Sequence, residues 1–216
     1  SGTTLTIGIE GGSNETVDLS SLSNADSIND LSDALIEDNS LYLGNDPSSS
    51  TSTAEYNVAV GATALDAVTT GDQNVAMGYD ALTANTTGYE NTAVGFESLQ
   101  LNTTGIANTA IGYLSMTSST TSQLNTAIGI RSLERTTSGN SNSGVGAHAL
   151  RYNTTGAHNA AIGYDALTAN TTGGNNVAVG SATLDTNTTG SNNTAIGASA
   201  DVASAALTNA TAIGYG

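Results

Sequence analysis

Residues 159–175 read NAAIGYDALTANTTGGN, and variants of this 17-residue unit fill the chain from Asn57 to Gly214. One glycine of the unit recurs at the same position in ten successive copies, with no insertion or deletion between them. These structural glycines are Gly61, Gly78, Gly95, Gly112, Gly129, Gly146, Gly163, Gly180, Gly197 and Gly214. Such regular self-similarity indicates a solenoid, in which each thin unit stacks only on its neighbours.

Each column of the repeat, meaning the residues that occupy one position of the unit, has a narrow composition. The residue before the glycine is Val, Ile or Met, the residue two before it is Ala in nine copies, and the residue four before it is Asn in nine copies. At the fourth position after the glycine stands Leu or Met in eight copies, followed by a Thr-Thr pair and usually a second glycine. The consensus is N-T-A-I-G-Y-x-A-L-x-x-N-T-T-G-x-x.

The invariant period favours stacked β-structure over helices. In a β-coil a slip of one residue moves side chains to the wrong face, so the register is tightly specified. Paired Thr and two glycines in each copy disfavour a helix, and a 17-residue unit accommodates two short strands and two turns. The sequence therefore predicts an all-β fold, a parallel β-solenoid (β-roll) of about ten 17-residue coils over residues 55–216.

The dipeptides Ala161-Ile162 and Ala166-Leu167 represent the two strands expected in each coil. Because neighbouring side chains of a strand point to opposite faces, each strand has one face of large aliphatic residues and one of small residues. We expect the large residues to close the interior and the small residues to receive another subunit, which predicts a homotrimer of parallel chains. The structural glycines are expected at positive-φ corners, and the Asn columns are expected to form amide ladders.

Residues 1–54 lack the repeat and are predicted to form a short mixed connector. Alternating residues indicate strands within Thr3–Ile9 and Thr16–Leu19. Apolar residues three and four apart indicate a short helix, or a brief coiled-coil turn in an oligomer, within Ser27–Leu35. The Ser/Thr-rich stretch Ser48–Thr53 reads as a linker into the first coil.

The composition is acidic and poor in bulky residues. The net charge is −16, from nineteen acids against three arginines, although ten of the acids lie between Ser1 and Glu55. This balance disfavours nucleic acids and anionic membrane surfaces as partners. No apolar run reaches the roughly 18–20 residues that span a bilayer, which predicts no membrane insertion.

Neither an active site nor a cofactor site can be argued from the residue pattern. The absence of cysteine excludes disulfides and thiol catalysis. His148 and His158, the two histidines, occupy different columns and cannot stack on each other. In a trimer each could meet its two symmetry copies at a metal on the axis, but a surface position or polar packing is the favoured interpretation. Evenly spaced glycines follow from coil geometry and need no phosphate ligand. We therefore expect no enzyme activity, no cofactor and no metal.

The three arginines of the chain fall close together in the sequence and predict a binding patch. A 17-residue offset places Glu134 below Arg151, and the same offset places Arg131 below His148 and Arg135 below Tyr152. Arg and Tyr are enriched at binding hot spots. The predicted patch comprises Arg131, Arg135, His148, Arg151 and Tyr152. The alternative is a surface ion pair between Glu134 and Arg151, which contributes less than about 1 kcal/mol.

An aromatic column follows the glycine column and includes Tyr79, Phe96, Tyr113 and Tyr164. Packing over the coil edge and a platform for carbohydrate both remain open as interpretations of these rings.

Two parts of the chain resemble known fibrous proteins. Asn193-Thr194-Ala195-Ile196-Gly197 and residues 209–214 resemble the head repeat of trimeric autotransporter adhesins, which are trimeric left-handed parallel β-rolls that bind host surfaces. Residues 28–35 and 41–45, together with the N-T-A-I-G…N-T-T-G arrays, are similar to segments of bacteriophage tail-fibre proteins. The resemblance implies a trimeric attachment fibre, located in a virion tail fibre or at a cell surface.

The expected function is therefore that of a structural or adhesive fibre segment that projects or forms a host-attachment surface. Its expected partners are further copies of itself and a host-surface receptor or glycan. An ice-binding β-solenoid and a passive spacer remain as alternatives. Regular Thr columns could order water, but neighbouring Thr residues point in opposite directions and leave a single outward rank.

Overall fold

The computed structural model describes residues 4–7, 15–18, 34–37, 39–44, 53–202 and 204–215. These residues form strands and turns, with no helix among them. The short strands β1 (Thr4–Ile7) and β2 (Glu15–Asp18) pair antiparallel in a two-stranded sheet. They overlap the two strands that were predicted for the connector.

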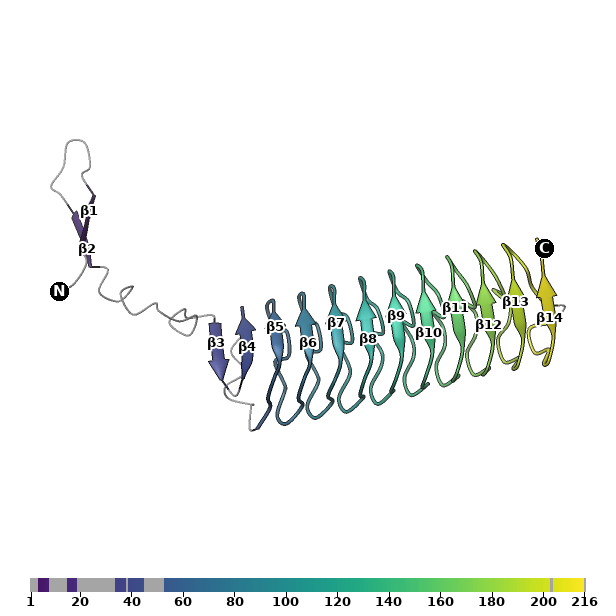
Figure 1. The fold of residues 1–216 in the computed structure, drawn as a ribbon, viewed down its shortest axis with the longest axis horizontal. Helices are drawn as coiled ribbons and strands as arrows, with labels where there is room; N and C mark the ends of the chain where they lie inside the picture. Colours follow the sequence, from purple (N-terminus) through teal and green to yellow (C-terminus); the bar gives the residue numbers. More distant parts are fainter. Residues whose placement is uncertain are drawn as a thin grey trace.

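A twelve-stranded sheet follows the chain order from β3 to β14 and forms one side of a rod (Figure 1). Its strands are β3 (Ala34–Glu37), β4 (Ser40–Leu43), β5 (Val58–Val60), β6 (Val75–Met77), β7 (Thr92–Val94), β8 (Thr109–Ile111), β9 (Thr126–Ile128), β10 (Ser143–Val145), β11 (Ala160–Ile162), β12 (Val177–Val179), β13 (Thr194–Ile196) and β14 (Thr211–Ile213).

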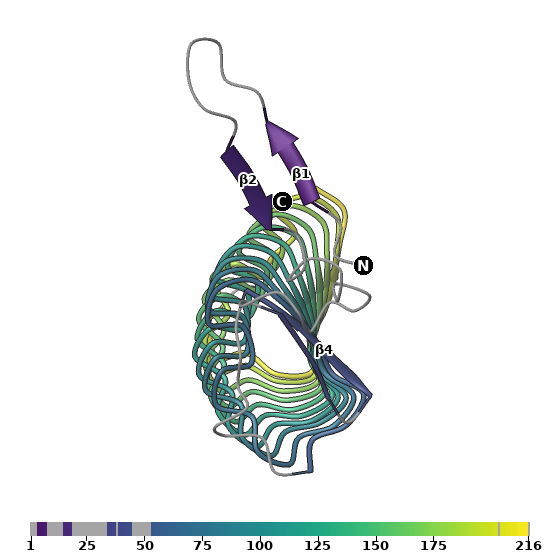
Figure 2. The same cartoon turned by 90° about the vertical axis from the view of Figure 1, so that its left-hand side faces the viewer.

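The eleven strands from β4 to β14 are all parallel, and each residue pairs with its counterpart in the next copy of the repeat. Viewed along the rod, successive coils follow nearly the same outline (Figure 2). The predicted parallel β-solenoid with its 17-residue coils is confirmed.

The predicted short helix within Ser27–Leu35 is wrong at its carboxyl end. Ala34 and Leu35 belong to β3, which pairs antiparallel with β4 across a turn where Asn39 has a φ of 60°. Pairing with the first strand of the stack therefore overrides the helical spacing of the apolar residues. The remainder of that stretch, and the linker apart from Thr53, lie outside the described residues.

The parallel stack begins one strand before the first complete copy of the repeat. Tyr42 stands one repeat length before Ala59, pairs with it and is completely buried. The backbone N–H of Asn57 donates a hydrogen bond of 2.9 Å to Oγ of Ser40, which takes the place of an asparagine. Gly44 stands in the glycine column with a φ of 83°.

Each coil contains one strand, and the second strand expected at Ala166-Leu167 is wrong. Ala166 and Leu167 lie in a run of turns, and both side chains are completely buried. Two consecutive residues of a strand cannot both face the interior. In the turn, the leucine column has a left-handed backbone with φ between 51° and 54°, and this conformation allows both neighbouring side chains to face the interior. This column comprises Leu65, Leu82, Leu99, Met116, Leu133, Leu150, Leu167 and Leu184.

The orientation of the strands is also opposite to the prediction, which placed the large aliphatic residues in the interior and the small residues outside. Ala161 at the centre of β11 is completely buried, whereas 48% of Ile162 is exposed. Because Leu167 and its column already fill the interior of each small coil, only a methyl group fits on the inner face of the central strands. Tyr42 occupies the same column in β4, before the leucine column begins. The small residues therefore line the core, and the large aliphatic residues face outward.

The predicted asparagine ladder is confirmed and runs through the interior. Asn108 Nδ2 donates to Asn91 Oδ1 at 3.1 Å and to the carbonyl oxygen of Ser122 at 2.8 Å. Its Oδ1 accepts hydrogen bonds of 3.1 Å from both the backbone N–H and the Nδ2 of Asn125. A second ladder links Asn170 Nδ2 to Asn153 Oδ1 at 2.8 Å. These bonds satisfy buried polar groups that would otherwise destabilise the rod.

The geometry favours glycine in both glycine columns, for different reasons. Gly112, like the other structural glycines, has a positive φ, here 140°, which confirms the expected corner. A Cβ at Gly112 would also lie 2.5 Å from the carbonyl oxygen of Gly129. Gly156 in the second column has no positive φ, but its Cβ would lie 2.4 Å from the carbonyl oxygen of Gly173. Coils therefore approach each other closely at both corners, although Ser122 and Leu207 replace glycine at two positions of the second column.

Candidate functional site

The turns that follow β9 and β10 bring two of the three arginines to one carboxylate. Arg151 Nε donates a hydrogen bond of 2.6 Å to Glu134 Oε2, which confirms the pair predicted from the 17-residue offset. Arg131 Nε lies 4.0 Å from the same oxygen. The hydrogen bond to Glu134 raises the pKa of Arg151 above its usual value. The carboxylate therefore orients one guanidinium group and attracts a second.

Tyr152 provides the second contact of the patch. The guanidinium carbon of Arg135 lies 5.1 Å from the ring centroid, and that of Arg151 lies 5.0 Å from it. Both distances fall in the range of cation–π interactions, which contribute about 0.5–1 kcal/mol at exposed sites. The predicted vertical contact between Arg135 and Tyr152 is confirmed.

His148 extends the patch toward the next coil. Its Nδ1 lies 3.1 Å from Asp165 Oδ1, and its ring centroid is 5.8 Å from that of Tyr164. A hydrogen bond with Asp165 raises the pKa of Tyr164. The sequence reasoning missed Asp165, although the 17-residue offset from His148 identifies it. Arg131 and His148 share one column as predicted, whereas His158 lies in another column and contacts none of the patch residues described.

A larger apolar surface flanks the structural glycines on both sides. We call it the apolar strip, and it consists of exposed aliphatic residues before the glycines and mostly aromatic residues after them. Its members are Met77, Tyr79, Phe96, Ile111, Tyr113, Ile128, Ile130, Ile162, Tyr164, Ile196, Ile213 and Tyr215, of which between 39% and 87% is exposed. A large side chain has a surface of about 200 Å², and roughly half of each member is exposed, so the strip presents on the order of 1,000 Å². Apolar patches of monomeric proteins rarely exceed about 600 Å².

Three aromatic residues of the strip stack along the rod. The ring of Phe96 lies 5.3 Å from that of Tyr79 and 5.5 Å from that of Tyr113, with interplanar angles of 17° and 22°. The ring faces therefore cover each other. A carbohydrate platform presents ring faces to the sugar, so this arrangement favours the packing interpretation.

The Thr-Thr pairs leave one outward rank of hydroxyl groups, as the sequence predicted. Thr154 Oγ1 donates to the carbonyl oxygen of Thr171 in the next coil at 3.0 Å, and the same bond recurs along the column. Its neighbour Thr155 is exposed. A single rank of hydroxyl groups makes a poor template for the two-dimensional lattice of ice, so no observation favours the ice-binding alternative.

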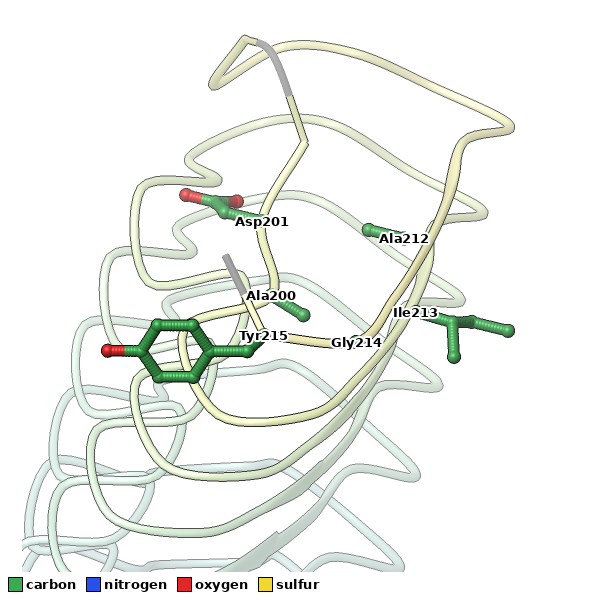
Figure 3. Close-up of a pocket in the computed structure, with 6 residues that line it drawn as sticks. All are labelled: Ala200, Asp201, Ala212, Ile213, Gly214 and Tyr215. Atoms are coloured by element: carbon green, nitrogen blue, oxygen red, sulfur yellow. The ribbon is translucent and has the colours of Figure 1, made fainter.

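A cavity of about 240 Å³ lies at the carboxyl end of the stack (Figure 3). Its lining residues are Ala200, Asp201, Ala212, Ile213, Gly214 and Tyr215. Asp201 occupies the leucine column, and the side chain of Ala212 is partly exposed. The cavity therefore lies at the last coil that the structure describes.

Comparison of the chain with protein-family models, curated proteins and solved structures finds no match. Among the described residues, no helix is long and apolar enough to cross a bilayer. The same part of the chain holds no cluster of three or more His, Cys, Asp or Glu residues that could bind a metal ion.

Proposed function

We propose that the solenoid is the shaft or head segment of a homotrimeric attachment fibre, with a structural and adhesive role at a virion or cell surface. The apolar strip is the observation that carries this proposal, and the resemblance of the repeats to adhesin heads and tail fibres agrees with it. The proposed partners are two further copies of the chain and a surface receptor or glycan.

The size of the strip supports self-association. In a ring each subunit buries this apolar area, on the order of 1,000 Å², against its two neighbours together, and the total is comparable with the ~800 Å² that one partner buries in a typical stable protein interface. Its long dimension follows the rod, about 45–50 Å for ten coils at the spacing of neighbouring strands. A partner of the same length and the same repeat, namely another copy of the chain, matches it coil by coil.

The position of the strip supports a cyclic arrangement. The glycine column forms a corner, with aliphatic residues such as Ile162 on one side and aromatic residues such as Tyr164 on the other. In a ring of three parallel chains, the aliphatic side of one subunit meets the aromatic side of the next. Such a heterologous contact closes when the rotation is about 120°. A rotation axis along the rod keeps equivalent coils at the same height.

The polar chemistry of the interior serves stacking, which fits a structural role without catalysis. Ser98 Oγ donates to the carbonyl oxygen of Ala110 at 2.9 Å, and Ser132 Oγ donates to that of Gly144 at 2.9 Å. Together with the asparagine ladders, these bonds join neighbouring coils. The proposed role is therefore mechanical: a stiff rod that positions an attachment surface.

Placing charges on the strip tests the proposal. We expect the double substitution Ile128→Glu and Ile162→Glu to separate the subunits, because association would bury two unpaired carboxylates per chain. The matched control, Thr121→Glu with Thr155→Glu, adds the same charge to the exposed rank of the two preceding coils and should leave the assembly intact. Sedimentation velocity measures both. A strip variant that sediments with the parent, and retains its circular dichroism spectrum, contradicts the proposed interface.

A further inference from the structure

We propose that Arg131, Arg135 and Arg151, positioned by Glu134 and Tyr152, bind the carboxylate or sulfate groups of an acidic polysaccharide. This inference deepens the adhesive role and rests on the proposed function for its valency, because a trimer would carry three such patches at one height.

The charge of the patch sets it apart from the rest of the rod. The chain has a net charge of −16, and these three arginines are its only permanently charged cationic side chains. Arg131 and Arg151 lie near the carboxylate of Glu134, and Arg135 lies over the Tyr152 ring, so three guanidinium groups against one carboxylate leave a net positive charge at this surface. Asp165, the nearest further acid, is engaged with His148 at 3.1 Å. An anionic ligand is therefore attracted to the arginines of this patch and repelled by the acidic residues elsewhere on the rod.

The hydrogen-bond donors of the patch are largely free. Arg151 uses its Nε for Glu134 and keeps the other N–H groups of its guanidinium. Arg131 lies 4.0 Å from Glu134, beyond hydrogen-bond distance. Arg135 is exposed, and among the described residues none accepts a hydrogen bond from its guanidinium group, although its backbone N–H donates to the carbonyl oxygen of Arg151. Guanidinium groups with open donors match carboxylate and sulfate oxygens, to which they can bind in a bidentate manner.

The same contacts reduce the cost of ordering these side chains on binding. The guanidinium groups of Arg135 and Arg151 both lie near the ring of Tyr152, which holds them in one place on the surface. Glu134 fixes Arg151 further, with a hydrogen bond of 2.6 Å. Long side chains that are already ordered lose less conformational entropy when a ligand binds.

An acidic polysaccharide fits this surface better than a nucleic acid. Double-stranded DNA carries one negative charge per ~1.7 Å of its axis, and an otherwise acidic rod repels such a density over its whole length. A polysaccharide with at most one charge per sugar can place a single anionic group in the patch. A weak contact of this kind becomes useful when three sites act together.

The test measures binding of the intact fibre to immobilised dextran sulfate, polygalacturonate, neutral dextran and single-stranded DNA. We expect binding to one or both acidic polysaccharides, weakening as salt rises from about 50 to about 200 mM. Retention by dextran sulfate alone assigns sulfate, and retention by polygalacturonate assigns carboxylate. Equal retention by neutral dextran, or tighter retention by DNA, overturns the proposal, and so does the absence of binding to either acidic polysaccharide.

Substitution of Arg131, Arg135 and Arg151 by Gln is expected to weaken this binding at least about tenfold, through loss of charge-assisted hydrogen bonds. Unchanged binding of the triple variant overturns the proposal. The single variant Arg135→Gln, which breaks no ion pair, should weaken binding as well and excludes an effect of misfolding.

A control variant carries Thr70→Glu, Thr87→Glu and Thr189→Glu, which give the same net charge as the triple substitution on exposed positions away from the patch. This control should bind the polysaccharide like the parent. If it binds as weakly as the triple Gln variant, the binding depends on net charge alone and the proposed patch is wrong. Sedimentation of each variant is measured in parallel. If the parent sediments as a single chain and still binds through the patch, the proposed trimer is wrong and the proposed binding site is supported. Failure of the trimer is therefore distinguishable from failure of the binding site.

Discussion

Deletion of Ala127 alone is expected to unfold the central coils of the rod, whereas deletion of the complete repeat unit Asn125–Ser141 should leave a shorter rod that stays folded. Ala127 pairs with Ala110 on one side and Gly144 on the other. Removing it shifts the following residues by one position, so that Ile128 enters an interior that admits only a methyl group. The local fold then loses several buried contacts and ladder bonds at once, at a cost above about 4 kcal/mol.

The deletion of a whole unit preserves every column, because the coils on either side meet with the same residues at the same positions. The substitution Ala127→Ser is the matched control and should cost about 1–3 kcal/mol, as it buries one additional hydroxyl group. Thermal unfolding followed by circular dichroism compares the three variants. A one-residue deletion that melts with the parent would mean that the coils are not held in register by their interior.

Asn108→Asp is expected to lower the free energy of unfolding by about 3–5 kcal/mol at neutral pH, because it places an unpaired charge in the core. The carboxylate cannot donate the hydrogen bonds that Nδ2 makes to Asn91 and to the carbonyl oxygen of Ser122. It also faces the oxygen of Asn91 at close range. Each of these effects follows from the complete burial of the ladder.

The control for this substitution is Asn140→Asp. Asn140 is exposed, and its Oδ1 accepts a hydrogen bond of 2.8 Å from the backbone N–H of Gln123. An aspartate keeps this acceptor, so we expect a change within about 0.5 kcal/mol. Urea denaturation gives both values. Equal stability of the two variants would show that the ladder contributes little to the rod.

The stacking could be predicted from the sequence because residues 17 positions apart lie next to each other in successive coils. The 17-residue offset correctly paired Glu134 with Arg151 and Arg135 with Tyr152, and it predicted the asparagine ladders. The same rule applied to His148 would have identified Asp165. It also identifies Tyr42 as the residue that pairs with Ala59, before the consensus begins.

The orientation of the strands could not be predicted from the same pattern. Ala161 and Ile162 are both apolar, and alternation alone does not say which of them faces the interior. The answer depends on Leu167, whose positive φ of 53° turns it inward and fills the coil. A left-handed conformation at leucine has no signature in residue propensities. The surface that we propose for association therefore consists of the outward aliphatic and aromatic residues, and not of the small residues that the sequence indicated.

The mass of the intact chain in solution, measured by light scattering at micromolar concentration, tests the central claim of a trimeric fibre most directly. The chain has a mass of 21.4 kDa, and three parallel copies joined through the apolar strip predict a stable mass of about 64 kDa. A concentration-independent mass of 21.4 kDa would contradict the trimer and leave the strip exposed on a single rod.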